Sequence, residues 1–91
     1  DNSMYGTIGM HSYVRYPGKP FMQGTKLTNP DFAAWARSFG AEGITIQTEA
    51  DVSAAINKAF SIRVKPVVIH CHTSAVQMSA WRKYERSETL T

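Results

Sequence analysis

The stretch between Gly43 and Cys71 limits the fold more than any other part of the chain. Residues 43–47 form a short β-branched run, and residues 67–69 are Val-Val-Ile without polar alternation, as in a strand covered on both faces. Between them, apolar side chains recur at the spacing of one helix face: Val52, Ala55, Ile56, Ala59 and Phe60. This order predicts a βαβ unit with parallel strands and a right-handed crossover.

A further helix is predicted just before this unit, over residues 30–39. Asn29 is the expected N-cap, Pro30 takes the first helical position, and Asp31 places a negative charge at the positive end of the helix dipole. Gly40 supplies a left-handed stop after the last turn. The predicted buried face consists of Phe32, Trp35, Ala36 and Phe39. The helix of the βαβ unit has its own start signal, a capping-box-like pair of Thr48 and Asp51.

The segments outside residues 29–73 are less regular. Residues 5–14 carry apolar side chains near helical spacing and predict a short helix, and residues 16–28 are a loop dense in proline and glycine. The tail, residues 74–91, is predicted to be helical around Trp81 and Tyr84. The chain is thus expected to be one partial domain with four parts, residues 1–15, 16–28, 29–73 and 74–91.

Composition excludes several classes of protein. With 91 residues and 43% hydrophobic side chains, the chain is of the size of one small globular domain. A net charge of +3 is too mild to indicate nucleic-acid binding, and the cations near Trp81 are more typical of a solvated helix face. No apolar run approaches the roughly 20 residues of a membrane span. The lone Cys71 excludes an internal disulfide and is consistent with a cytoplasmic location.

Two predicted strands are too few for a free-standing α/β domain. A parallel sheet needs helices on both faces and further strands at its edges. The fold class is therefore α/β, a partial doubly wound parallel sheet in which a βαβ unit is flanked by helices. Because open edges and apolar surface would be left uncovered, we expect the chain to form a homo-oligomer or to pair with the remainder of a larger enzyme.

Several short segments, in the same order, resemble one enzyme family. Residues 2–11 are similar to the end of the thiamine-diphosphate motif, which runs from Gly-Asp-Gly to Asn-Asn and is followed in many members by Tyr-Gly. Residues 27–32, 36–41 and 65–69 continue the similarity. The order and spacing resemble the C-terminal, cofactor-binding domain of the acetolactate synthase and benzoylformate decarboxylase group. The similarity covers residues 1 to about 73, the second half of that domain.

The resemblance implies part of a Mg²⁺–diphosphate site at the start of the chain. Asn2 would offer its side-chain oxygen and Met4 its main-chain carbonyl to Mg²⁺, a hard cation that prefers oxygen. The third protein ligand would be the aspartate of Gly-Asp-Gly, which in the family lies upstream of the position of Asp1. Asp1 itself stands where the family has its first asparagine, a departure that could alter contacts beside the metal.

The same resemblance assigns the following turn to the cofactor, thiamine diphosphate. The residues concerned are Tyr5, Gly6, Thr7 and Ile8. They would open a helix whose free N–H groups bind the diphosphate, with Thr7 and Ile8 near the thiazolium and substrate. Pyruvate decarboxylases place an acid at the position of Ile8, so an apolar residue there argues against their proton relay.

The implied activity is that of a lyase or transferase acting on 2-oxo acids. Three hypotheses stay open: a segment of such an enzyme, a non-catalytic remnant that self-associates as a binding module, and an unrelated small α/β domain. This chain alone is expected to be inactive and to bind thiamine diphosphate and Mg²⁺ weakly or not at all, because the charged ligand and the family's activating glutamate are not among its residues.

The run His70-Cys71-His72 raises the question of a transition-metal site. Side chains alternate across a strand, so His70 and His72 share a face while Cys71 points to the other. The three side chains therefore cannot hold one tetrahedral zinc ion. A site that adds His11 to the two histidines is an alternative, and the Cys71 thiol is expected to be a small buried apolar group.

Overall fold

The computed structural model describes residues 1–16, 18, 24–79 and 82–83. The chain separates into two compact units. The first, here called the sheet unit, consists of Asp1 and Asn29–His72. The second, the helix unit, consists of Asn2–Thr28 and Thr73–Thr91. The grouping of all residues into one partial domain stays a prediction.

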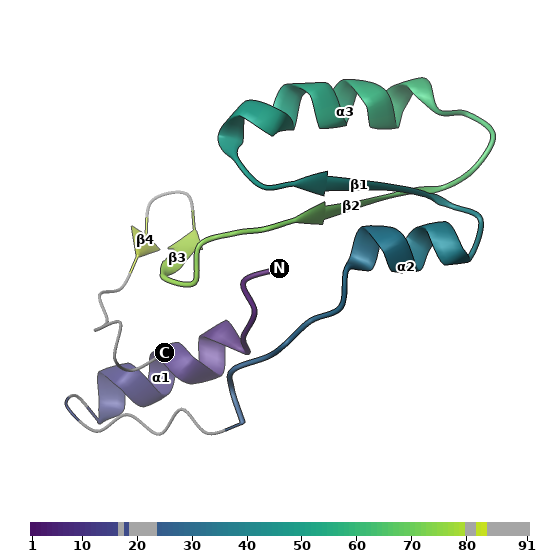
Figure 1. Ribbon diagram of the computed structural model, residues 1–91. Helices are drawn as coiled ribbons and strands as arrows, with labels where there is room; N and C mark the ends of the chain where they lie inside the picture. The colour runs from purple at the N-terminus through teal and green to yellow at the C-terminus, as the bar shows by residue number, and fades with distance from the viewer. Residues whose placement is uncertain (17, 19–23, 80–81, 84–91) are drawn as a thin grey trace. The chain divides into compact units, whose positions relative to one another are not determined.

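The sheet unit contains the predicted βαβ arrangement (Figure 1). Strands β1 (Glu42–Ile46) and β2 (Val67–Cys71) are parallel, with Ile44 opposite Ile69. A 3₁₀ turn, η1 (Glu49–Asp51), and helix α3 (Val52–Ser61) connect them. Helices α2 (Phe32–Ser38) and α3 lie on opposite faces of the two strands, so the α/β fold class is confirmed.

Helix α2 starts at a different signal from the one expected and ends at the expected one. Its N-cap is Asp31, whose carboxylate accepts a hydrogen bond from the Ala34 N–H at 3.0 Å, so the assignment of the cap to Asn29 was wrong. The carboxylate is close enough to reach this N–H because Asp31 directly precedes the first helical residue. Gly40 has φ +85°, which confirms the left-handed stop.

The predicted buried face of α2 is correct for Ala36 but wrong for Trp35 and Phe39, and Phe32 is half-buried. Ala33 is 0% exposed and Ala36 6%, whereas Trp35 is 58% and Phe39 76% exposed. The reason lies in β1: a Cβ placed on Gly43 would come within 2.1 Å of the Ala33 carbonyl oxygen. The helix backbone therefore packs directly on the strand, and only the small side chains fit between them.

Helix α3 follows the same rule. Of its predicted apolar face, Ala55 is buried and Ala59 half-buried, while Val52, Ile56 and Phe60 are exposed. The capping box predicted for Thr48 and Asp51 is confirmed. The Asp51 carboxylate accepts hydrogen bonds from the N–H groups of Thr48 and Gln47 at 3.1 and 3.2 Å. The small residues of both helices thus set how closely they approach the sheet.

The helix unit contains α1 (Gly6–Arg15), which is shifted by one residue from the helix predicted at 5–14. An isolated antiparallel bridge joins Met4 to Lys26, and both Met4 and Thr25 are buried. Within residues 1–16, 18, 24–79 and 82–83, none of the helices has the length and hydropathy of a membrane span.

The described part of the C-terminal tail is not helical, which corrects the prediction for residues 74–79 and 82–83. Strands β3 (Gln77–Ser79) and β4 (Arg82–Lys83) pair in antiparallel fashion. The Ser74 hydroxyl accepts hydrogen bonds from the N–H groups of Val76 and Gln77, at 3.1 and 3.2 Å, and this local turn leads into a strand. The predicted features at Trp81 and Tyr84 lie outside the described residues.

Candidate functional site

The residues that the sequence analysis assigns to cofactor and metal line one pocket of the helix unit. Its volume is about 420 Å³. The lining residues are Asn2, Met4, Tyr5, Gly6, Thr7, Ile8 and Gln77. The first six are those predicted, whereas Gln77, from β3, was not foreseen because the tail was read as a helix. Tyr5 and Ile8 are exposed, so the pocket opens to solvent.

A tight turn places Asn2 against the main chain of Met4. The side-chain oxygen Oδ1 of Asn2 accepts a hydrogen bond from the Met4 N–H at 3.3 Å. Ser3, between them, has φ 58°, a left-handed conformation that is uncommon outside glycine. Such a conformation costs about 1–2 kcal/mol, so the surrounding contacts must stabilise the turn. Oδ1 of an amide has two lone pairs and can accept this bond while also facing a cation.

The bridge between Met4 and Lys26 fixes the direction of the Met4 carbonyl. The bridging hydrogen bonds are made by the neighbours: Tyr5 N–H donates to Thr25 O at 2.7 Å, and Leu27 N–H donates to Ser3 O at 2.7 Å. In this non-hydrogen-bonded type of pair, the N–H and C=O of the paired residue point away from the partner strand. The bridge thus directs the Met4 carbonyl to the side away from Lys26.

The first turn of α1 lines the pocket. Tyr5 occupies the N-cap position without a side-chain hydrogen bond to the helix, and its carbonyl accepts from the Gly9 N–H at 3.0 Å. The first turn of a helix carries N–H groups that have no intrahelical acceptor, here those of Gly6, Thr7 and Ile8. These groups and the helix dipole favour an anion at this end.

Gly6 leaves room that any other residue would fill. A Cβ at this position would come within 2.8 Å of Nδ2 of Asn2. Glycine therefore lets the amide of Asn2 lie directly over the helix start. Two neutral oxygen donors beside an uncapped helix N-terminus are suited to a hard cation that bridges to a phosphate group.

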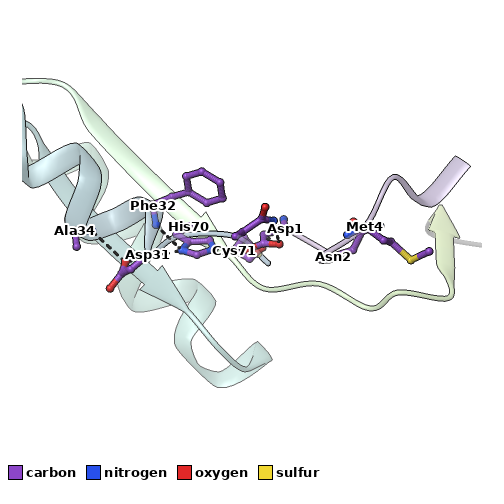
Figure 2. Close-up of polar contacts among 9 residues, drawn as sticks. Asp1, Asn2, Met4, Asp31, Phe32, Ala34, His70 and Cys71 are labelled. Carbon is purple, nitrogen blue, oxygen red and sulfur yellow. Dashed lines mark hydrogen bonds and ion pairs between the residues drawn. The ribbon is translucent and has the colours of Figure 1, made fainter. Parts of the chain in front are cut away.

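Asp1 does not line this pocket; its contacts belong to the sheet unit. Its carboxylate accepts a hydrogen bond from Asn29 Nδ2 at 2.8 Å and meets His70 Nε2 at 2.5 Å (Figure 2). Its main-chain nitrogen donates to the carbonyl of Cys71 at 2.8 Å. These bonds hold Asp1 at the end of β2, where its side chain is only 6% exposed.

The sequence analysis did not identify the hydrogen-bonding partners of His70. Its ring lies between the start of α2 and Asp1, and its side chain is 5% exposed (Figure 2). The Phe32 N–H donates to Nδ1 at 3.2 Å, so Nδ1 carries a lone pair and Nε2 carries the proton that faces Asp1. The signal was present: a polar residue inside the apolar strand Val67–Cys71 must find a hydrogen-bonding partner.

The other residues of the histidine run are arranged as strand geometry requires. The rings of His70 and His72 lie with centroids 4.2 Å apart, which confirms that they share a face. His11 belongs to the helix unit, and Cys71 is a half-buried free thiol. Within the sheet unit, Asp1 lies beside the histidine pair, and the alternative that adds His11 stays a prediction.

Electrostatic effects in the sheet unit arise at its helix starts and at Glu42. The hydrogen bond from the Ala34 N–H holds the pKa of Asp31 below its ordinary value. The charge of Lys58, followed by that of Lys65, lowers the pKa of Glu42, and both ammonium groups lie 3.5 Å from its carboxylate oxygens. Asp31 caps α2 and Glu42 begins β1, and neither carboxylate lines the pocket at the start of α1.

Comparison with known proteins gives one match. Residues 1–71 match the model of the family described as thiamine pyrophosphate enzyme, C-terminal TPP binding domain. No curated protein and no solved structure was matched. The matched residues include the whole βαβ unit and six of the seven residues that line the pocket. The chain belongs to the C-terminal thiamine pyrophosphate-binding domain family of thiamine pyrophosphate enzymes.

Proposed function

We propose that the chain is the second half of the cofactor-binding domain of a 2-oxo acid carboligase or decarboxylase of the acetolactate synthase and benzoylformate decarboxylase type. Family membership implies thiamine diphosphate as the cofactor. The observation that carries the proposal is the pocket at the start of α1, which gathers Asn2, Met4 and the first helical turn. These residue types fit a diphosphate bound through Mg²⁺.

Asn2 and Met4 contribute two of the oxygen ligands of Mg²⁺. The turn through Ser3 supports this role because it holds the Asn2 amide beside the main chain of Met4. The bridge to Lys26 supports it further, since it directs the Met4 carbonyl away from the neighbouring segment. Both ligands are neutral, so a carboxylate from outside residues 1–91 completes the site.

The first turn of α1 binds the diphosphate and positions the rest of the cofactor. Gly6, Thr7 and Ile8 present N–H groups toward the pocket end of the helix. Thiamine diphosphate, when bound, supplies a nucleophilic carbon and an electron sink for cleavage or formation of the bond next to a 2-oxo group. The exposed apolar side chain of Ile8 excludes water near the substrate rather than moving a proton.

A second candidate function is a self-associating, non-catalytic module derived from this domain. It is favoured by the large apolar side chains that the sheet unit leaves exposed, among them Trp35, Phe39 and Phe60. The two functions make different predictions for the pocket. A cofactor-binding half retains affinity for Mg²⁺ and diphosphate together, and a module that only associates has no such preference.

The test is a titration of the ¹⁵N-labelled chain with thiamine diphosphate and Mg²⁺, followed by amide chemical shifts. We expect weak but saturable shifts centred on Gly6, Thr7 and Ile8, which require Mg²⁺ and disappear in Asn2→Ala. Thiamine without the diphosphate should produce none of them. Asn57→Ala, an exposed amide on α3, is the matched control and should bind as the wild type does.

Two results would overturn the proposal. The first is an absence of saturable shifts at the start of α1. The second is binding that Asn2→Ala leaves unchanged, since it would place the cation elsewhere. If the chain nevertheless associates in solution, the first result favours the self-associating module.

A further inference from the structure

A second group of metal-ligand side chains lies at the end of β2, in the sheet unit. Asp1, His70 and His72 each offer one ligand atom, and these atoms lie within 4.8 Å of one another. His70 and His72 project from the same face of the strand, with ring centroids 4.2 Å apart. The hydrogen bond from the Asp1 nitrogen to the Cys71 carbonyl holds the carboxylate beside them.

We propose that Asp1, His70 and His72 form a site for a divalent transition-metal ion of the Zn²⁺ class. Two imidazoles and one carboxylate are a ligand set that suits Zn²⁺, Co²⁺ or Ni²⁺, whereas Mg²⁺ prefers oxygen alone. Three protein ligands leave a fourth position for water or an added ligand. The site is thus chemically distinct from the Mg²⁺–diphosphate site and lies in the other unit.

Binding requires the proton of His70 to change its place. In the metal-free chain, Nδ1 accepts from the Phe32 N–H and Nε2 carries a proton toward Asp1. A metal ion takes the lone pair of Nε2, so that proton leaves to solvent and Nδ1 takes one up. The imidazole stays neutral overall, and its N–H now lies at Nδ1.

Asp31 is placed to accept a hydrogen bond from the new N–H at Nδ1 of His70. Its Oδ1 lies 4.0 Å from Nδ1 of His70, so a small turn of the ring converts this separation into a hydrogen bond. Metal-bound histidines commonly donate their second N–H to a carboxylate, which fixes the tautomer and the ring orientation. The Phe32 N–H loses its acceptor in this state; it belongs to the first turn of α2, where water can replace it.

Two of the three side chains are buried and one is exposed, so the site is both fixed in place and accessible to an ion from solvent. The side chains of His70 and Asp1 are 5% and 6% exposed, whereas His72 is exposed. An ion can therefore bind first at His72 and then displace the proton between His70 and Asp1. Because that proton's hydrogen bond must be given up, binding is weaker than in a preformed structural zinc site.

The experiment is a titration of the whole 91-residue chain with Co²⁺ followed by its visible absorption, and with Zn²⁺ in competition. We expect one equivalent of Co²⁺ to bind with the intense d–d bands of a four- or five-coordinate ion, and Zn²⁺ to displace it. Mg²⁺ in excess should not. His72→Ala and Asp1→Asn should each lower the affinity by at least about tenfold, and Asp31→Asn, which keeps the helix cap, by about tenfold.

Matched controls separate this site from other sources of binding. His11→Ala removes an exposed histidine of the helix unit and should leave Co²⁺ affinity unchanged. His72 is exposed, so His72→Ala should keep the far-ultraviolet circular dichroism of the wild type. Unchanged Co²⁺ binding in His72→Ala, or no saturable binding by the wild type, would overturn the proposal.

Discussion

His70 and Asp1 lie 69 positions apart in the sequence, yet Nε2 of the histidine meets Oδ2 of the aspartate at 2.5 Å. The contact joins the end of β2 to the residue that precedes the pocket at the start of α1 in the sequence, and the Phe32 N–H bonds to the other side of the ring. His70 therefore links a strand, the start of a helix and the first residue of the chain within one unit.

This arrangement predicts that the sheet unit depends on His70. In His70→Ala, the Asp1 carboxylate and the Phe32 N–H both lose a partner, and an unsatisfied buried polar group costs about 1–3 kcal/mol. We expect the free energy of unfolding to fall by roughly 3 kcal/mol, since charged groups are at the upper end of that range. Urea denaturation followed by circular dichroism measures it. His72→Ala, on the exposed neighbour, is the control, and an equal loss there would contradict the role of His70.

Close packing of α2 on β1 predicts a strong effect at Gly43. A Cβ there would lie 2.1 Å from the Ala33 carbonyl oxygen, a backbone atom that can give way only if the helix moves. Gly43→Ala should therefore destabilise the chain by about 3 kcal/mol. Gly40→Ala is the comparison: nothing lies within 4 Å of its Cβ, and the cost is limited to about 1–2 kcal/mol from its positive φ. Similar denaturation midpoints for the two variants would show that α2 is not held so closely.

Acid should weaken the sheet unit partly through Glu42. Lys58 and Lys65 lower the pKa of Glu42 in the folded chain below its ordinary value of 4.5. A depressed folded pKa means that the stabilisation is present above pH 4.5 and is lost as the pH falls through the lower folded value. Glu42→Gln should therefore unfold with a shallower dependence on pH below that point. The effect is small because the pair is exposed, and the measurement is the urea midpoint as a function of pH.

Exposed aromatic residues predict self-association. Trp35 and Phe39 stack edge to face, with centroids 5.6 Å apart, on a helix face that nothing in the sheet unit covers. Parallel two-strand sheets also have open edges. We expect light scattering at micromolar concentration to report a species larger than a monomer, and Phe39→Asp to shift it toward the monomer. Val64→Asp, at a residue 93% exposed in the loop after α3, should not. A stable wild-type monomer would contradict the prediction.

The βαβ unit could be predicted from the sequence because its signals are local. The apolar run at Val67 and the helical spacing from Val52 each identify one element without reference to the rest of the chain. The face that α2 buries could not, because aromatic side chains are usually core residues and only the approach of Ala33 to Gly43 decides otherwise. The burial of hydrophobic side chains depends on how closely two backbones meet, and sequence periodicity does not report that distance.

The two candidate sites also differ in how far they could be predicted from the sequence. The pocket at the start of α1 was assigned by resemblance, and its residues are neighbours in sequence, so the local turn at Ser3 suffices to bring them together. The pairing of His70 with Asp1 joins the two ends of a 69-residue separation. No periodicity links such positions, and only the unsatisfied polar group in an apolar strand indicates that a partner exists. The β3–β4 pair was missed because a few residues of helical spacing cannot be distinguished from a short hairpin.

A substitution at Gly6 should reduce cofactor binding without lowering the stability of the chain. A Cβ at Gly6 would lie 2.8 Å from Nδ2 of Asn2, so Gly6→Ala must displace the amide that the proposed Mg²⁺ site uses. Alanine favours helix more than glycine, so α1 itself should not be weakened. We therefore expect Gly6→Ala to reduce the Mg²⁺-dependent shifts produced by thiamine diphosphate, while the denaturation midpoint is kept or raised.

The control for this prediction is Ser12→Ala, one turn beyond Gly9. Ser12 is half-buried and does not line the pocket, whereas Gly9 is buried and would itself disturb the helix if substituted. Calorimetry with the wild-type chain should give an affinity weaker than micromolar, since both ligands supplied here are neutral and Mg²⁺ gives up its water reluctantly. Undiminished cofactor shifts in Gly6→Ala would show that the Asn2 amide does not lie in the binding path, and micromolar binding by the wild type would show that association of the chain supplies the missing ligand.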